Sequence, residues 1–151
     1  MEFFIIVLII IMDQTSKFAA VKFLKDRKPK VIIENFFQLN YVENRGAAFG
    51  ILEHKRIFFV IITLAIIIFL SFYLIKHHGS LNILTKLSFS MLIAGAAGNL
   101  IDRIRLGYVI DFISFRFKGL YSFPVFNLAD TFIVISTILV VIIILFDKIE
   151  V

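Results

Sequence analysis

The sequence has no cysteine among its 151 residues. This absence excludes disulfide bonds, thiolate metal sites and a cysteine nucleophile, and it leaves the redox compartment undetermined. The histidines His54, His77 and His78 also lack the spacing with acids that a His-Glu-x-x-His zinc site requires. We therefore expect neither a metal ion nor another cofactor.

A basic segment is missing before the first apolar run, which extends from Phe3 to Met12. A secretory signal peptide begins with Lys or Arg, whereas this chain has Glu2 at that position. We therefore interpret the first run as the start of a transmembrane helix over residues 2–23. That length is close to the roughly 20 residues that a bilayer requires.

The features of a nucleic-acid-binding protein are missing as well. The formal net charge is +5, with 16 Lys and Arg against 11 Asp and Glu. However, the basic residues lie between hydrophobic runs, and no aromatic-interleaved RNA motif accompanies them. Contact with anionic lipid headgroups explains this charge better, so we expect membrane lipid and no nucleic acid as a partner.

Apolar residues dominate the chain. They make up 60% of it and include 19 Phe, and the mean hydropathy is +0.98. Soluble domains contain roughly 45–50% apolar residues, and a soluble core of this size could not bury so many. The sequence therefore predicts one mainly α-helical membrane domain, residues 1–151, with four transmembrane spans over residues 2–23, 57–75, 82–104 and 128–146.

Two polar stretches leave the membrane between these spans. Residues 24–56 contain β-branched and aromatic segments and a turn signal at Asn44-Arg45-Gly46, which predicts a small β-rich cap. Residues 105–127 are expected to form a loop. With four spans, both termini lie on one side and the two long stretches on the other. Counting Lys and Arg places the long stretches in the cytoplasm.

Intramembrane charge is costly unless it is paired, and the first span contains such a pair. Asp13 and Lys17 are four residues apart with the acid first, which is the favourable order for an ion pair within a helix. We expect this pair to be structural.

A second polar group lies at the end of the third span and the start of the fourth. Asn99 and Arg103 share a helix face, with Asp102 beside it, and the small residues 94–98 permit close packing against the fourth span. Asp111 and Asp130 could then converge with Asn99, Arg103 and Asn127. Two carboxyl groups across a water cannot both ionise easily, so one stays protonated and the other acts as a base. The alternative is that Asp130 only caps the fourth helix and Asp111 ends a strand.

Five motifs together resemble the bacterial lipoprotein signal peptidase (signal peptidase II) family, and they occur in that family's order across nearly the whole chain. They are Asp13-Gln-Thr-Ser-Lys17, Asn44-Arg-Gly-Ala-Ala-Phe-Gly50, Gly95-Ala-Ala-Gly-Asn99-Leu-Ile-Asp-Arg103, Val109-Ile-Asp111-Phe and Phe126-Asn127-Leu-Ala-Asp130.

The resemblance implies an aspartic endopeptidase that cleaves diacylglyceryl-modified prolipoproteins just before the lipidated cysteine. Asp111 and Asp130 would be the catalytic dyad. The residues that would bind substrate or support the dyad are Asp13, Lys17, Asn44, Arg45, Gly46, Asn99, Asp102, Arg103 and Asn127.

The resemblance also implies a location and a fold. The protein would be a multi-pass protein of the bacterial inner (plasma) membrane, with cytoplasmic termini and an active site toward the extracytoplasmic face, contrary to the charge count. Its fold would combine four transmembrane helices with a small extracytoplasmic β-rich cradle and a periplasmic helix. Cyclic peptides of the globomycin type would inhibit it.

Two other interpretations remain. A small proton-coupled transporter or channel could relay protons through Asp13, Asp102, Asp111 and Asp130, although the chain has no internal repeat of the kind many transporters show. A non-catalytic membrane scaffold could use the same charges for helix assembly alone.

Overall fold

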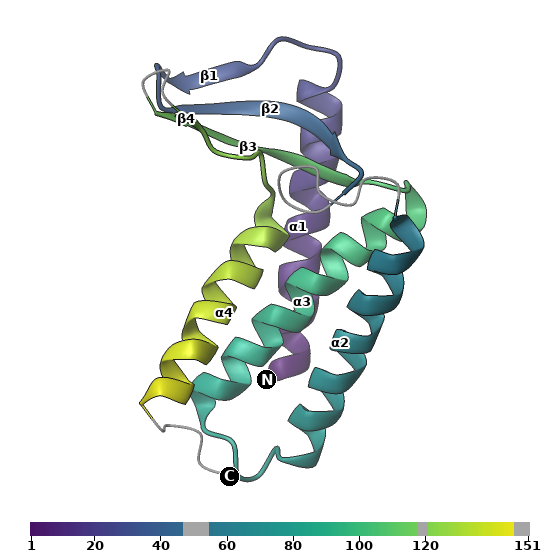
Figure 1. Cartoon of the computed structure of the whole chain (residues 1–151), viewed down its shortest axis with the longest axis vertical. Helices are drawn as coiled ribbons and strands as arrows, with labels where there is room; N and C mark the ends of the chain where they lie inside the picture. Colours follow the sequence, from purple (N-terminus) through teal and green to yellow (C-terminus); the bar gives the residue numbers. More distant parts are fainter. Residues whose placement is uncertain (47–54, 118–120, 147–151) are drawn as a thin grey trace.

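Four helices form a bundle below a small antiparallel sheet (Figure 1). The computed structural model describes residues 1–46, 55–117 and 121–146. The helices are α1 (Glu2–Leu24), α2 (Arg56–Lys76), α3 (Ile83–Arg105) and α4 (Leu128–Leu145). Each is long and apolar enough to cross a membrane, which confirms the prediction of four transmembrane helices.

Helix α3 lies at the centre of the bundle and packs against α1, α2 and α4. Its small residues permit this position, because two of its glycines face other chain segments with no room for a side chain. A Cβ atom on Gly95 would lie 2.6 Å from the backbone oxygen of Ala129 on α4. A Cβ atom on Gly98 would lie 2.5 Å from Oδ2 of Asp13 on α1. The close approach expected from residues 94–98 therefore occurs.

The outer surfaces of the helices remain apolar. Large side chains such as Ile68 and Phe72 on α2 and Val134 and Ile138 on α4 are exposed. Since these apolar side chains are exposed on the outside of the bundle, lipid is the solvent that matches them.

The two extramembrane stretches combine into one sheet with the strand order β1-β2-β3-β4. Its strands are β1 (Lys30–Ile33), β2 (Phe37–Asn44), β3 (Val109–Phe117) and β4 (Tyr121–Ser122). The prediction of a loop over residues 105–127 is wrong for residues 109–117, because β3 pairs with β2 from the first stretch. Val42 on β2 lies opposite Asp111 on β3.

The sheet is joined to the bundle at the end of α1, where Ala20 and Leu24 pack with Ile110 of β3. The resemblance also implies a helix outside the membrane. Residues 25–46 contain strands and turns and no helix, and residues 47–54, which include the second half of the Asn44–Gly50 motif, lie outside the described residues.

Candidate active site

A cavity of about 770 Å³ lies where β2, β3, the end of α3 and the start of α4 meet. Asp111 from β3 and Asp130 from the first turn of α4 both line it. Its other wall is apolar and includes Ile133, Val134 and Ile135 of α4. The cavity therefore offers a pair of carboxyl groups beside a surface suited to acyl chains or apolar side chains.

Asp111 is 1% exposed and receives one hydrogen bond on each carboxylate oxygen. Asn127 donates from Nδ2 to Oδ1 at 2.7 Å, and Asn44 donates from Nδ2 to Oδ2 at 2.9 Å. Burial, followed by the nearby charge of Asp130, raises the pKa of Asp111 to about 7. This carboxyl group therefore holds a proton over a range of pH where an exposed aspartate is ionised.

Asp130 also has a donor for each oxygen. Asn99 donates from Nδ2 to Oδ1 at 2.7 Å, and the backbone N–H of Asn127 donates to Oδ2 at 3.2 Å. Asn127 is the N-cap of α4, since its Oδ1 accepts the backbone N–H of Asp130 at 2.9 Å, so the two residues form a capping box. The alternative in which Asp130 is itself the cap is thus not the observed arrangement.

Asn127 connects the two acids. It is fully buried, and its Nδ2 contacts both Oδ1 of Asp111 at 2.7 Å and Oδ1 of Asn99 at 3.1 Å. Its backbone and side chain meanwhile hold Asp130 in the capping box. One asparagine therefore sets the relative position of both carboxyl groups.

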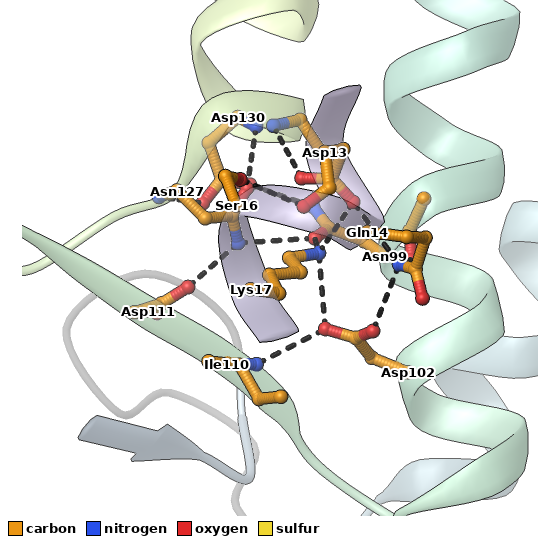
Figure 2. A network of polar contacts seen from close by, with 12 residues as sticks. Asp13, Gln14, Ser16, Lys17, Asn99, Asp102, Ile110, Asp111, Asn127 and Asp130 are labelled. Carbon is orange, nitrogen blue, oxygen red and sulfur yellow. Dashed lines mark hydrogen bonds and ion pairs between the residues drawn. The ribbon is translucent and has the colours of Figure 1, made fainter. Parts of the chain in front are cut away.

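Behind this group lies a buried ionic cluster, shown in Figure 2. Lys17 Nζ lies 2.9 Å from Oδ2 of Asp13 and 3.0 Å from Oδ2 of Asp102, so the predicted pair within α1 forms and gains a second acid from α3. Asp102 does not line the cavity with the dyad. Its Oδ2 accepts the backbone N–H of Ile110 at 3.1 Å, which fixes the start of β3 just before Asp111.

Sequence reasoning missed Gln14, which donates from Nε2 to Asp13 Oδ2 at 3.1 Å and to Asp102 Oδ1 at 3.1 Å. The residue lies inside the Asp13–Lys17 motif, and its position there was the available signal. It also donates to the backbone oxygen of Gly98 at 3.2 Å, so it ties α1 to α3.

Arg103 lines the cavity from the end of α3. It donates from Nη2 to the backbone oxygen of Gly46 at 3.2 Å, and its guanidinium lies over the ring of Phe59, 4.9 Å from the centroid. The first contact joins the segment after β2 to α3, the helix that carries Asn99, and the second joins α2 to α3.

Two further predicted residues lie in that segment after β2. Arg45 pairs with Glu43 at 3.1 Å and lies over the ring of Tyr108, 5.2 Å from its centroid. The backbone N–H of Gly46 donates to Oδ1 of Asn44 at 3.0 Å. This bond directs the other end of the Asn44 amide, its Nδ2, toward the dyad.

The described residues contain no group of three or more His, Asp or Glu side chains arranged to hold a metal ion. The cavity therefore contains two buried carboxyl groups. Each accepts a hydrogen bond from an asparagine side chain, and the surroundings of the two groups differ. Such a pair can act as general acid and general base on a bond held between them.

Comparison with known proteins identifies a family of peptidases. The family model described as "Signal peptidase (SPase) II" matches residues 5–146. A lipoprotein signal peptidase of Clostridium tetani is 48% identical over 145 residues, which cover 96% of this chain and 92% of the relative. One from Caldanaerobacter subterraneus is 46% identical and covers 92% of each chain.

Solved structures show the same fold. A structure described as a bacterial membrane enzyme at 2.3 Å resolution superposes with a TM-score of 0.87 at 38% identity, over 97% of this chain and 88% of that one. A second structure of a bacterial membrane enzyme, at 1.9 Å resolution, has a TM-score of 0.83 at 38% identity, over 95% of this chain and 92% of that one. These matches give no support to a transporter or channel. The chain belongs to the signal peptidase II family of membrane proteases.

Proposed function

We propose that this signal peptidase is an aspartic endopeptidase that cleaves diacylglyceryl-modified prolipoproteins just before the lipidated cysteine. Asp111 and Asp130 are its catalytic dyad. The observation that carries the proposal is that both carboxyl groups line one cavity while a single buried side chain, Asn127, contacts both residues. This arrangement matches the need of an aspartic mechanism for two carboxyl groups that share one proton.

In the proposed reaction, the ionised carboxylate takes a proton from a water molecule as that water attacks the scissile carbonyl carbon. The protonated carboxyl donates a hydrogen bond to the carbonyl oxygen and then a proton to the departing nitrogen. The chemistry uses only side chains that the cavity contains, and the hydrogen bonds to Asn44, Asn99 and Asn127 hold both acids in place.

The surroundings of the dyad support a lipidated substrate. The cavity wall on α4 includes Val134 and Ile135, and both side chains are also exposed on the outside of the helix bundle. A substrate with acyl chains can reach this wall only laterally, through the bilayer, and apolar contact would hold the chains there. We therefore propose prolipoproteins and membrane lipid as partners. The family resemblance adds cyclic peptides of the globomycin type as inhibitors.

The residues proposed to support the dyad form two groups, according to what they contact. Asn44, Asn99 and Asn127 touch the dyad, and Arg103 lines the cavity with Asn44, Arg45 and Gly46, where substrate would lie. Asp13, Lys17 and Asp102 form the ionic cluster behind it. Their proposed task is to position the residues that touch the acids.

We also propose a bacterial inner (plasma) membrane location with cytoplasmic termini and an extracytoplasmic dyad. Several basic residues of the long stretches are engaged in contacts within the protein, which supports this location against the charge count. Lys25 and Arg45 both pair with Glu43, and Arg56 donates to the backbone oxygen of Ile104 at 2.7 Å. Both stretches are short enough for the positive-inside rule to apply, so the proposal rests on the family resemblance and on these engaged charges and not on the charge count.

The test is cleavage of a diacylglyceryl-modified prolipoprotein by purified protein in detergent. Cleavage should proceed without added metal and in the presence of EDTA. Asp111→Asn and Asp130→Asn should each reduce the rate by at least about 10²-fold, the lower range for loss of an acid or base group.

Asp26→Asn is the matched control, because this exposed aspartate lies in the turn after α1 with a φ of 59°, which Asn also tolerates. It should retain full activity. Undiminished cleavage by either dyad variant would refute the assignment of the dyad.

A further inference from the structure

Lys17 contacts a neutral amide in addition to its two acidic partners. Its Nζ is almost wholly buried and lies near the two acids of the ionic cluster and 3.0 Å from Oδ1 of Asn99 (Figure 2). An ammonium group has three protons to donate, and each of these three oxygens can accept one. The third bond leads to a neutral amide whose other end contacts the dyad.

That contact fixes the orientation of the Asn99 amide. Oδ1 of Asn99 accepts from Lys17 Nζ and from Asn127 Nδ2 at 3.1 Å, which uses both of its lone pairs. A reversed amide would direct its NH₂ group at the ammonium and at another donor. Nδ2 of Asn99 is therefore held toward Oδ1 of Asp130, at 2.7 Å.

The two acids consequently differ in their surroundings. Asp130 receives the amide that Lys17 orients, a backbone N–H from its capping box, and the partial positive charge of the N-terminal turn of α4. Asp111 lies in a strand, and its donors are Asn44 and Asn127. Each hydrogen bond to an ionised oxygen favours the charged form, and the helix terminus adds to this for Asp130 alone.

Other charged groups near the cavity do not cancel this difference. Among the described residues, Arg103 from the end of α3 and Glu43 and Arg45 at the end of β2 line the cavity. Asp13 and Lys17 from α1 and Asp102 from α3 lie behind the dyad in the ionic cluster. Arg103 interacts electrostatically with both Asp111 and Asp130. Glu43 is paired with Lys25 and Arg45. The remaining difference between the surroundings of Asp111 and Asp130 comes from Asn99 and from the start of α4.

We propose that Lys17 is a positioning residue that acts through Asn99, so that Asp130 is the ionised base and Asp111 the protonated acid before substrate binds. This inference rests on the function proposed above. In the reaction, a water oxygen bonds to the scissile carbon while its proton moves to Asp130. The carbon–nitrogen bond then breaks as the proton of Asp111 moves to nitrogen. Proton exchange between the dyad and water restores the starting state.

The first test is the double variant Lys17→Met/Asp13→Asn. It removes one positive and one negative charge, so the net charge of the cluster is unchanged. The amide oxygen introduced at position 13 can still accept the backbone N–H of Ala129, which Asp13 accepts at 2.9 Å. Without the ammonium, the Asn99 amide can reverse. We expect the acidic limb of the kcat–pH profile to move up by about one pH unit, with a much smaller change in KM.

Lys22→Met is the control, because Lys22 lies on the same helix but is exposed. It should leave the profile unmoved. A double variant that is folded and less active, yet keeps the wild-type position of the acidic limb, would show a purely structural role for Lys17 and overturn the proposal.

The second test uses the wild-type protein and does not depend on the folding of a cluster variant. The carboxyl carbons of the aspartates are labelled with ¹³C, and the dyad resonances are assigned by their loss in Asp111→Asn and Asp130→Asn. At about pH 6 the Asp111 carbon should have the shift of a protonated acid and the Asp130 carbon that of a carboxylate. The reverse assignment would overturn this inference while leaving the dyad intact, whereas cleavage by the Asn variants would refute the dyad itself.

Discussion

Asp13 on α1 accepts a hydrogen bond of 2.9 Å, through Oδ1, from the backbone N–H of Ala129 at the start of α4. Its other oxygen pairs with Lys17. The first helix of the chain therefore caps the last one, one residue before Asp130. This contact explains why an acid in the first transmembrane span matters to a site formed by residues far later in the chain.

Replacement of Asp13 by alanine should destabilise the protein by about 3–5 kcal/mol, because it removes one partner of a buried ion pair and leaves a helix N–H without an acceptor. Thermal unfolding in detergent would measure this loss. Asp13→Asn keeps an oxygen for the Ala129 N–H and should cost less. Equal stability of the alanine variant and the wild type would show that the contact contributes nothing.

Gly98→Ala should destabilise the bundle by about 1–3 kcal/mol, the usual effect of overpacking. The added Cβ atom would lie 2.5 Å from Oδ2 of Asp13, so the carboxylate or one of the two helices must shift. Gly79→Ala is the control, since nothing lies within 4 Å of a Cβ atom there. A difference between the two variants in unfolding temperature and in cleavage rate is expected, and identical behaviour would contradict the close packing.

Cleavage should fall as the pH rises through the pKa of Asp111, about 7, because the dyad then loses its proton. Burial raises the pKa of Asp111, and this shift also makes the stability of the folded protein depend on pH. A pKa above the usual 3.8 means that the folded state holds a proton that the unfolded state has released, so the stability contribution of this group also declines as the pH rises through about 7. Initial rates measured across the pH range would give the alkaline limb. A rate that rises steadily into alkaline solution would contradict a protonated Asp111.

Thiol labelling can determine the orientation, since the chain has no cysteine of its own. Lys28 follows α1 on the side of the sheet, and His78 lies in the turn between α2 and α3 at the opposite end of the bundle (Figure 1). In single variants Lys28→Cys and His78→Cys, an impermeant reagent added to intact cells should label position 28 alone. Labelling of position 78 alone would reverse the proposed topology.

Much of the fold follows from local properties of the sequence. Apolar runs of bilayer length predict four helices, because a helix pairs its backbone groups within one segment, as lipid requires. The pairing of Asp13 with Lys17 was predictable for the same local reason, since residues four apart share a helix face. The resemblance in the five motifs singled out most of the polar residues that line the cavity or form the ionic cluster.

Other features depend on contacts between distant segments, and these only the tertiary structure decided. Residues 109–117 form a strand because β2 supplies the partner backbone groups, not because their own composition differs from that of a loop. Asp102 was expected to bind substrate or support the dyad. Its side chain turns to Lys17 and Ile110, because α1 brings a buried ammonium to that side of α3. The sequence by itself determined which polar residues enter the membrane, because these residues lie within apolar runs of bilayer length. Each of them needs a partner there. Which partner each one found was decided by the packing of α1, α3 and α4.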